Sequence, residues 1–192
     1  MTNMSDDKGY GFKITVIGDG AVGKTSLIKK YTQGAFQEEY ISTLGTQFSK
    51  YEEVIDGEKV ELYLWDIAGQ DSFQALRQRF YIGSSGAIIV FSHVPGQAQS
   101  YEHVNRWLSD LKKHCGNIPI VLFGNKVDLV DDGELSSNPN ILTSDSNVES
   151  LAKENRFIGY YKTSALTGQG VTDAFKALVK KLYMIAKISS FS

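Results

Sequence analysis

A glycine-rich stretch near the start of the chain carries the strongest signal for chemistry. Residues 18–25 read GDGAVGKT and fit the pattern G-x-x-x-x-G-K-[ST], between an apolar run at 12–17 and a helix-favouring run at 26–31. A strand that turns through glycines into a helix directs backbone N–H groups and the positive helix end toward one point, which suits a polyphosphate. Lys24 would reach the outer phosphates, and the Thr25 hydroxyl would ligate Mg²⁺. The pattern predicts a phosphate-binding loop.

A shorter motif closes the apolar run at 58–66. Asp66 ends this run and, together with Gly69, fits the pattern D-x-x-G. The pattern is common by chance, and the copy at 6–9 is set aside because no strand precedes it. At the end of a strand, the Asp66 carboxylate can face the shell of a Mg²⁺ ion through water, and the Gly69 N–H can meet a terminal phosphate. We therefore expect both residues beside the phosphate-binding loop.

Two further stretches indicate which base the site accepts. Residues 125–128 read NKVD just after an apolar strand, and Ser164 and Ala165 follow the last predicted strand. The Asp128 carboxylate can accept hydrogen bonds from N1–H and the exocyclic amine of guanine. Adenine lacks that pair of donors and would leave the carboxylate unpaired. A backbone N–H at 164–165 can meet guanine O6, so the sequence predicts a guanine nucleotide.

Length and composition restrict the classes of protein that fit. The chain has 192 residues, 42% hydrophobic and 22% charged, as expected for one domain with a sizeable core. Its net charge of −2 argues against nucleic acid as the main partner. The single cysteine, Cys115, cannot form an internal disulfide, which favours the cytoplasm. Because no run of eighteen apolar residues occurs, no membrane span is expected.

Strand-like and helix-like segments alternate along the chain, which is typical of an α/β fold. We expect one P-loop NTPase domain with a mostly parallel six-stranded sheet flanked by helices on both faces. An Asp-Gly pair at 56–57 predicts a hairpin. The expected strands are 12–17, 47–55, 58–66, 87–91, 118–123 and 157–163. The expected helices are 26–31, one whose apolar face spans 101–111, one opened by a capping box at 146–149, and one beginning at 171.

The remaining segments are expected to lie outside this framework. A flexible leader is expected at 1–11 and a short tail at 189–192, with the domain between them at 12–188. The polar segment 131–145 is interpreted as a surface loop. The strand at 58–66 has few polar residues on either face and is expected to be buried on both.

Taken in order, these motifs resemble those of the Ras-superfamily small GTPases, and most closely the Rab branch. The resemblance extends from residue 12 to about residue 187, and its most Rab-like segments are STLGTQF at 42–48, WDIAGQ at 65–70 and YKTSALTGQGV at 161–171. It implies a small G-domain that acts as a guanine-nucleotide switch in membrane traffic or related signalling. It also implies slow, partner-stimulated hydrolysis of GTP to GDP, and a monomer.

The resemblance also implies roles for residues that the motifs alone leave unassigned. Gly20 falls where a side chain would crowd the catalytic glutamine, and Gln70 falls at that glutamine, which orients the attacking water. Phe36 matches an aromatic that packs edge-on to the base, and Tyr40 matches a tyrosine that closes over the phosphates. Thr43 matches a threonine that ligates Mg²⁺ and senses the γ-phosphate. Ser42 is a competing choice whose spacing fits worse.

The predicted site and its partners follow from the motifs and the resemblance together. The predicted catalytic residues are Gln70, Lys24 and Thr43, and the predicted Mg²⁺ ligands are Thr25, Thr43 and, through water, Asp66. The predicted nucleotide contacts are Gly20, Ala21, Val22, Gly23, Lys24, Thr25, Ser26, Phe36, Tyr40, Thr43, Gly69, Asn125, Lys126, Asp128, Ser164, Ala165 and Leu166. An exchange factor, a GTPase-activating protein and effectors are expected to read residues 35–47 and 67–80.

Several positions depart from the family pattern. Leu166 stands where many relatives have a lysine stacked on the base, and Ile67 replaces the commoner threonine. Residues 93–95, HVP, replace the usual Asp-x-Thr, and the segment 131–145 is longer than usual. The chain as given ends without a C-terminal cysteine for prenylation, although peripheral association with a membrane stays compatible with the resemblance.

Two other functions fit parts of the sequence. A catalytically inert pseudo-GTPase would keep the nucleotide as a structural element of an interaction scaffold, but the chain retains Lys24, Thr43 and Gln70. A P-loop nucleotide kinase would need a lid with clustered arginines and would leave 125–128 unexplained. Phe36 and Tyr40 could also be packing residues, and the lysines of the final helix are interpreted as a solvated face rather than a membrane-binding patch.

Overall fold

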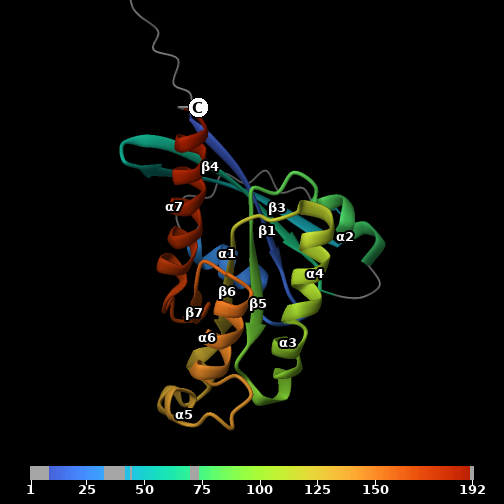
Figure 1. The fold of residues 1–192 in the computed structure, drawn as a ribbon, viewed down its shortest axis with the longest axis vertical. Coiled ribbons are helices and arrows are strands. Elements are labelled where there is room, and N and C mark those ends of the chain that lie inside the picture. Colours follow the sequence, from blue (N-terminus) through green and yellow to red (C-terminus); the bar gives the residue numbers. More distant parts are fainter. Residues whose placement is uncertain (1–8, 33–41, 44, 70–73, 191–192) are drawn as a thin grey trace, which may run out of the picture.

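A seven-stranded sheet with helices on both sides is the frame of the molecule (Figure 1). The computed structural model describes residues 9–32, 42–43, 45–69 and 74–190. The strands are β1 Tyr10–Ile17, β2 Ser42–Thr43, β3 Thr46–Ile55, β4 Glu58–Ile67, β5 Gly86–Ser92, β6 Ile120–Asn125 and β7 Tyr160–Thr163, in the order β2-β3-β4-β1-β5-β6-β7. All six predicted strands are therefore present, and the two-residue β2 adds a seventh at one edge.

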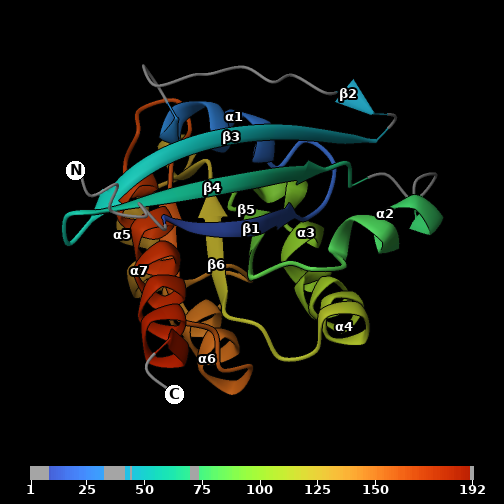
Figure 2. The same ribbon diagram turned by 90° about the horizontal axis from the view of Figure 1, so that it is seen from above.

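The sheet is parallel except at the β2 edge. β1 lies between β4 and β5 and is parallel to both, with Ile14 opposite Leu64 on one side and Gly86 on the other. β3 and β4 form the predicted hairpin, which curves as a long ribbon in Figure 2. Asp56 and Gly57 at its tip both have positive φ, 51° and 82°, as a type I′ turn requires. The Asp-Gly prediction is confirmed.

Seven α-helices are found in the described part of the chain. They are α1 Lys24–Tyr31, α2 Gln74–Tyr81, α3 Gln99–Glu102, α4 Val104–Cys115, α5 Asp132–Ser137, α6 Asp145–Glu154 and α7 Val171–Ser190, with 3-10 turns η2 Pro95–Gln97 and η3 Val127–Leu129. In Figure 1, α7 lies on one side of the strands and α2 and α4 lie on the other. Among the residues described, none of the helices has both the length and the apolar character needed to cross a membrane.

The alternation of apolar side chains along the strands supplies two hydrophobic cores. On β5, Ile88 and Val90 join the core beneath α1 and α7, whereas Ile89 and Phe91 join the core beneath α4 and α6. All seven residues of β5 are buried, which explains its continuous apolar run. β4 differs from its prediction, because Val60, Leu62 and Leu64 are buried but the side chains between them are only half-buried.

Three local predictions on the α4–α6 side are wrong. The single helix expected over 101–111 is interrupted at His103, between α3 and α4. The expected loop at 131–145 contains α5, whose N-cap Asp131 accepts hydrogen bonds from the N–H groups of Gly133 (2.8 Å) and Glu134 (3.2 Å). α6 begins at Asp145 with Ser144 as its N-cap, so the capping box predicted at 146–149 starts two residues too late.

His93, one of the departures from the family pattern, is a buried side chain just after β5. It is 2% exposed, and its Nε2 lies 2.9 Å from the Tyr160 hydroxyl on β7. Gly124 on β6 makes the room, because a Cβ there would collide with the His93 ring. Burial disfavours the charged imidazolium and lowers the pKa of His93 to about 4. His93 is thus a neutral core residue joining β5, β6 and β7.

Acid is therefore expected to destabilise the fold through His93, by about 2 kcal/mol between pH 7 and pH 5. The ring has a pKa of about 4 in the folded chain, against an ordinary value of 6.5. Below about pH 6.5, His93 is protonated in the unfolded chain but stays neutral in the folded chain, so the free energy of unfolding falls. This fall levels off once the pH is below the pKa of His93 in the folded chain. Urea unfolding at both pH values measures the loss. His93→Gln should lose less over the same interval, and an equal loss in both chains would contradict the assignment.

Candidate nucleotide-binding site

The predicted motifs converge at the carboxyl ends of the parallel strands. The phosphate-binding loop, residues 18–23, follows β1, and Asp66 lies at the end of neighbouring β4. The segments 125–129 and 163–166, which contain the predicted base contacts, lie at and beyond the ends of β6 and β7, which are paired. Because parallel strands end at one edge of the sheet, segments far apart in sequence meet there.

Two glycines shape the phosphate-binding loop. Gly18 and Gly23 have φ of 140° and 101°, and Gly23 is the left-handed N-cap of α1. A Cβ on Gly18 would collide with the Val90 carbonyl of β5, and one on Gly23 would collide with the Asn125 amide. By contrast, a Cβ on Gly20 would meet no described atom within 4 Å. The loop therefore winds tightly against β5 and β6 but is open at Gly20.

Lys24 places a buried positive charge inside this loop. It is 7% exposed, and its Nζ donates to the carbonyls of Gly18 (2.9 Å) and Asp19 (2.7 Å). Burial lowers the pKa of Lys24, while Asp66 and Asp19 act in the opposite direction. An ammonium group that backbone carbonyls hold at the start of a helix is suited to bind an anion with more than one charge.

Thr25 and Asp66 bring two oxygen ligands together from different elements. The Thr25 hydroxyl, on the first turn of α1, donates to the carboxylate of Asp66 on β4. Asp66 is 8% exposed, and burial raises its pKa against the opposing effects of Thr25 and Lys24. A hydroxyl and a buried carboxylate side by side fit Mg²⁺, which takes one or two protein oxygens together with water and phosphate. The residues predicted to hold the metal are thus adjacent.

Gly69 brings the chain after β4 against the phosphate-binding loop. A Cβ on Gly69 would lie 2.6 Å from the Gly20 nitrogen, and closer still to the backbone of Gly18 and Asp19. Such distances are far below van der Waals contact, so only glycine fits here. Two residues earlier, Ile67 is 1% exposed and packs in the core beneath α4, which accounts for an apolar residue at this departure from the family pattern.

Asn125 connects the segments of the site. Its Nδ2 donates to the Val22 carbonyl (2.8 Å), and its Oδ1 accepts from the Thr163 hydroxyl (3.3 Å) and the Ala165 N–H (3.2 Å). It is 1% exposed. Asn125 therefore joins the phosphate-binding loop to the last strand, and a contact between the Ala165 N–H and guanine O6 would have to share that N–H with Asn125.

The remaining predicted base contacts differ in exposure. Asp128 lies exposed in η3, and Leu166 is 76% exposed. Lys126 adopts a left-handed conformation with φ of 67° and donates from Nζ to Gln97 Oε1 at 2.9 Å. Ser164 is buried, and its hydroxyl accepts from the Thr167 N–H at 3.1 Å. Asp128 and Leu166 are therefore the ones open to a ligand.

A group of side chains that no motif in the sequence predicts holds the phosphate-binding loop from outside. The Asp19 carboxylate accepts from Trp107 Nε1 (2.8 Å) and lies 2.7 Å from His103 Nδ1. The guanidinium of buried Arg77, on α2, lies 4.6 Å over the Trp107 ring. This group links the loop, α4 and α2. An aspartate inside a phosphate-binding loop was the available signal, since such a charge requires a partner.

A comparison with known families identifies the chain. A model described as the Ras family matches residues 13–184. The chain belongs to the Ras family. Similar proteins are the GTP-binding protein ypt3 of Schizosaccharomyces pombe, 33% identical over 94% of this chain and 79% of its own length, and Ras-related protein RABA4d of Arabidopsis thaliana, 36% over 95% and 78%. Ras-related protein Rab-21 of Mus musculus is 34% identical over 94% and 77%.

These relatives place the chain in the Rab branch of the small GTPases. Three other predicted nucleotide contacts lie close to Lys24 in the sequence. Val22 is buried, whereas Ala21 and, on the first turn of α1, Ser26 are exposed. The predicted Phe36, Tyr40 and Gln70 lie outside the described residues. Thr43 lies in β2 opposite Thr46, and its role stays a prediction.

Proposed function

We propose that the chain is a guanine-nucleotide switch in membrane traffic that hydrolyses GTP and presents different surfaces in its GTP and GDP states. The observation that carries this proposal is the convergence of Lys24, Thr25 and Asp66 around one loop, with Asp128 exposed beyond the neighbouring strands. The first three residues fit the phosphates and a cation. Asp128 fits the two donors of guanine.

In the proposed reaction the protein positions groups and stabilises charge. Lys24 and the backbone amides of residues 20–25 bind the phosphates, and Gln70 orients the attacking water. Thr25, Asp66 and Thr43 would hold Mg²⁺, which supplies positive charge to the phosphate oxygens. When the terminal phosphate leaves, Thr43 and Gly69 lose a contact, and residues 35–47 and 67–80 loosen. Exchange factors, activating proteins and effectors would distinguish the two forms there.

Slow hydrolysis without a partner is part of the proposal. Arg77 is buried, and its guanidinium packs over the Trp107 ring of α4, so it is not positioned to contact the phosphates. In Ras itself, an arginine supplied by an activating protein raises turnover about 10⁵-fold, and stimulation on the order of that size is expected here. Single-turnover hydrolysis with and without candidate activating proteins would distinguish a switch from an inert scaffold.

Removing Mg²⁺ is expected to accelerate release of GDP by at least about tenfold, because the charge that joins the phosphates to Thr25 and Asp66 is lost. The measurement is release of a fluorescent GDP from the purified chain, with EDTA and then with excess Mg²⁺ restored. Retention of guanine nucleotide by the purified chain is the more basic test. A chain that binds no guanine nucleotide would refute the function, whereas release unaffected by EDTA would refute only the cation site.

A further inference from the structure

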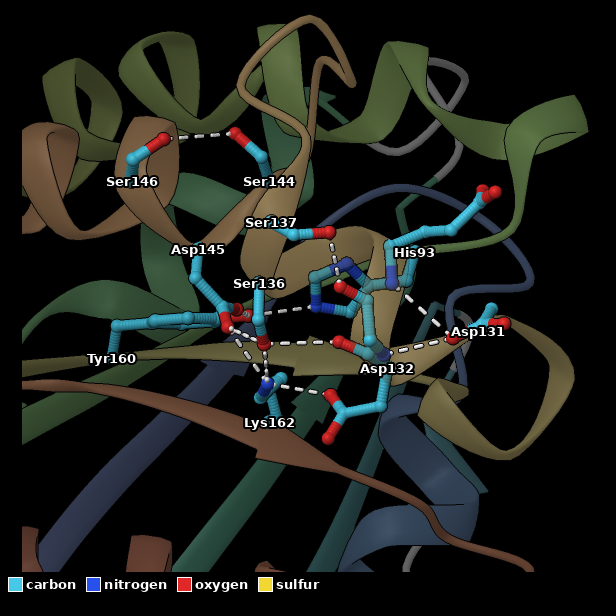
Figure 3. A network of polar contacts seen from close by, with 12 residues as sticks. His93, Asp131, Asp132, Ser136, Ser137, Ser144, Asp145, Ser146, Tyr160 and Lys162 are labelled. Atoms are coloured by element: carbon cyan, nitrogen blue, oxygen red, sulfur yellow. Dashed lines mark hydrogen bonds and ion pairs between the residues drawn. The ribbon is translucent and has the colours of Figure 1, made fainter.

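A polar cluster beside the base-contacting segments has no role in the function described so far. At its centre, Lys162 on β7 donates to Asp132 Oδ1 (2.5 Å) on α5 and to Asp145 Oδ2 (2.8 Å) at the start of α6 (Figure 3). The Ser136 hydroxyl also donates to Asp145 Oδ2 at 2.8 Å. One ammonium group thus holds together three successive elements, α5, α6 and β7.

The position of this cluster relates it to the nucleotide. Asp132 lies four residues after Asp128, and Lys162 lies two residues before Ser164. The ion pair therefore spans the outer flanks of the segments 125–129 and 163–166. On the inner side, Asn125 already joins the same two segments through Thr163 and Ala165. Breaking the outer connection would leave Asn125 and the backbone pairing of β6 with β7 to hold them.

Partial burial makes the ion pairs of Lys162 stronger than ion pairs on an exposed surface. The side chains of Lys162 and Asp145 are 23% and 19% exposed, while that of Asp132 is 57% exposed. Burial acts to raise the pKa of Asp145, yet hydrogen bonds from Lys162 and Ser136 keep it below its usual range. Burial likewise acts to lower the pKa of Lys162, and the two carboxylates raise it overall. Attraction therefore exceeds desolvation at both groups.

We propose that Lys162 is a positioning residue for the purine base, whose ion pairs with Asp132 and Asp145 hold the two base-contacting segments together and slow the release of guanine nucleotide. The inference rests on the proposed function, because it assigns the base to these segments. It also gives the segment 131–145 a role, since α5 supplies Asp132 and Ser136 to the cluster.

The test is release of fluorescent GDP from the full chain at fixed Mg²⁺. Lys162→Met, which keeps the length of the side chain but removes the charge, should release GDP about tenfold faster, with the association rate changed by less than about twofold. Lys162→Arg should restore slow release. The matched control is Lys176→Met, which removes a 3.8 Å ion pair with Glu53. It should leave release unchanged.

Two further measurements separate positioning from general stability. Wild-type release should accelerate with added NaCl, and release from Lys162→Met should lose most of that dependence. Asp132→Asn, a change at an exposed carboxylate, should accelerate release by itself and should add little to Lys162→Met, because both break the same connection. If Lys162→Met lowers the melting temperature, Asp132→Asn still tests whether the ion pair slows release.

The outcomes distinguish this inference from the function on which it rests. Wild-type chain that retains no GDP overturns both. Wild-type retention together with wild-type release rates in Lys162→Met and Asp132→Asn overturns the role of Lys162 alone. Additive effects of the two variants, or equal acceleration by Lys176→Met, would also overturn it, because the effect would then not arise from this connection.

Discussion

Gly69→Ala is expected to reduce single-turnover hydrolysis of GTP by at least about 100-fold, while the affinity for GDP changes by less than about threefold. The new Cβ would lie 2.6 Å from the Gly20 nitrogen and closer to the backbone of Gly18 and Asp19. These are backbone atoms, which cannot move aside as the end of a flexible side chain could. The chain after β4 must therefore move away from the phosphate-binding loop, and Gln70 would move with it.

Hydrolysis is measured by quenching GTP-loaded chain at intervals, and GDP affinity by titration of a fluorescent analogue. Gly96→Ala is the matched control, because a Cβ there would meet nothing within 4 Å and Gly96 is not among the glycines with positive φ. It should hydrolyse GTP at the wild-type rate. Wild-type hydrolysis in Gly69→Ala would show that the close approach is not needed for the reaction.

Asp128→Asn is expected to lower the affinity for GDP by at least about 100-fold and to make the xanthine analogue the preferred ligand. Two charge-assisted hydrogen bonds to guanine are lost, each worth about 1.5–3 kcal/mol. The new amide can donate to the carbonyl that xanthine carries at position 2. Because Asp128 is exposed in η3, the substitution should cost the fold little.

Parallel titrations with guanine and xanthine diphosphates measure the exchange of preference. Asp110→Asn on α4 removes the same charge away from the predicted base segments and should leave both affinities unchanged. If Asp128→Asn binds GDP as the wild type does, the assignment of the base to this segment is wrong.

The positions of the site residues could be predicted because each follows from a local signal. Gly18, Gly23 and Lys24 form a continuous motif, and Asp66 lies at the end of an apolar strand. Once the strands are taken as parallel, their ends must meet, and the structure places the Thr25 hydroxyl on Asp66 accordingly. The hairpin at 56–57 was equally local, because a type I′ turn depends on two residues alone.

Contacts made by tertiary structure could not be predicted in this way. Asp19 is separated from its partners His103 and Trp107 by 84 and 88 residues, and no periodicity connects them. The six-residue α5 is too short to show an apolar stripe, and its clearest local signal is the N-cap Asp131. The motif predicts that Asn125 contacts the nucleotide, and in the structure its side chain also joins the loop to β7. That role requires the assembled sheet.

The central place of β1 has a consequence for how the chain is made. Among the described strands, β1 leaves the ribosome before the others, but its neighbours in the sheet, β4 and β5, begin only at residues 58 and 86. At a synthesis rate of about 5–20 residues per second, the apolar strand β1 stays without a partner on either edge for several seconds. Nascent chains that end before β5 should therefore be the forms that depend most on a chaperone that binds unfolded chains.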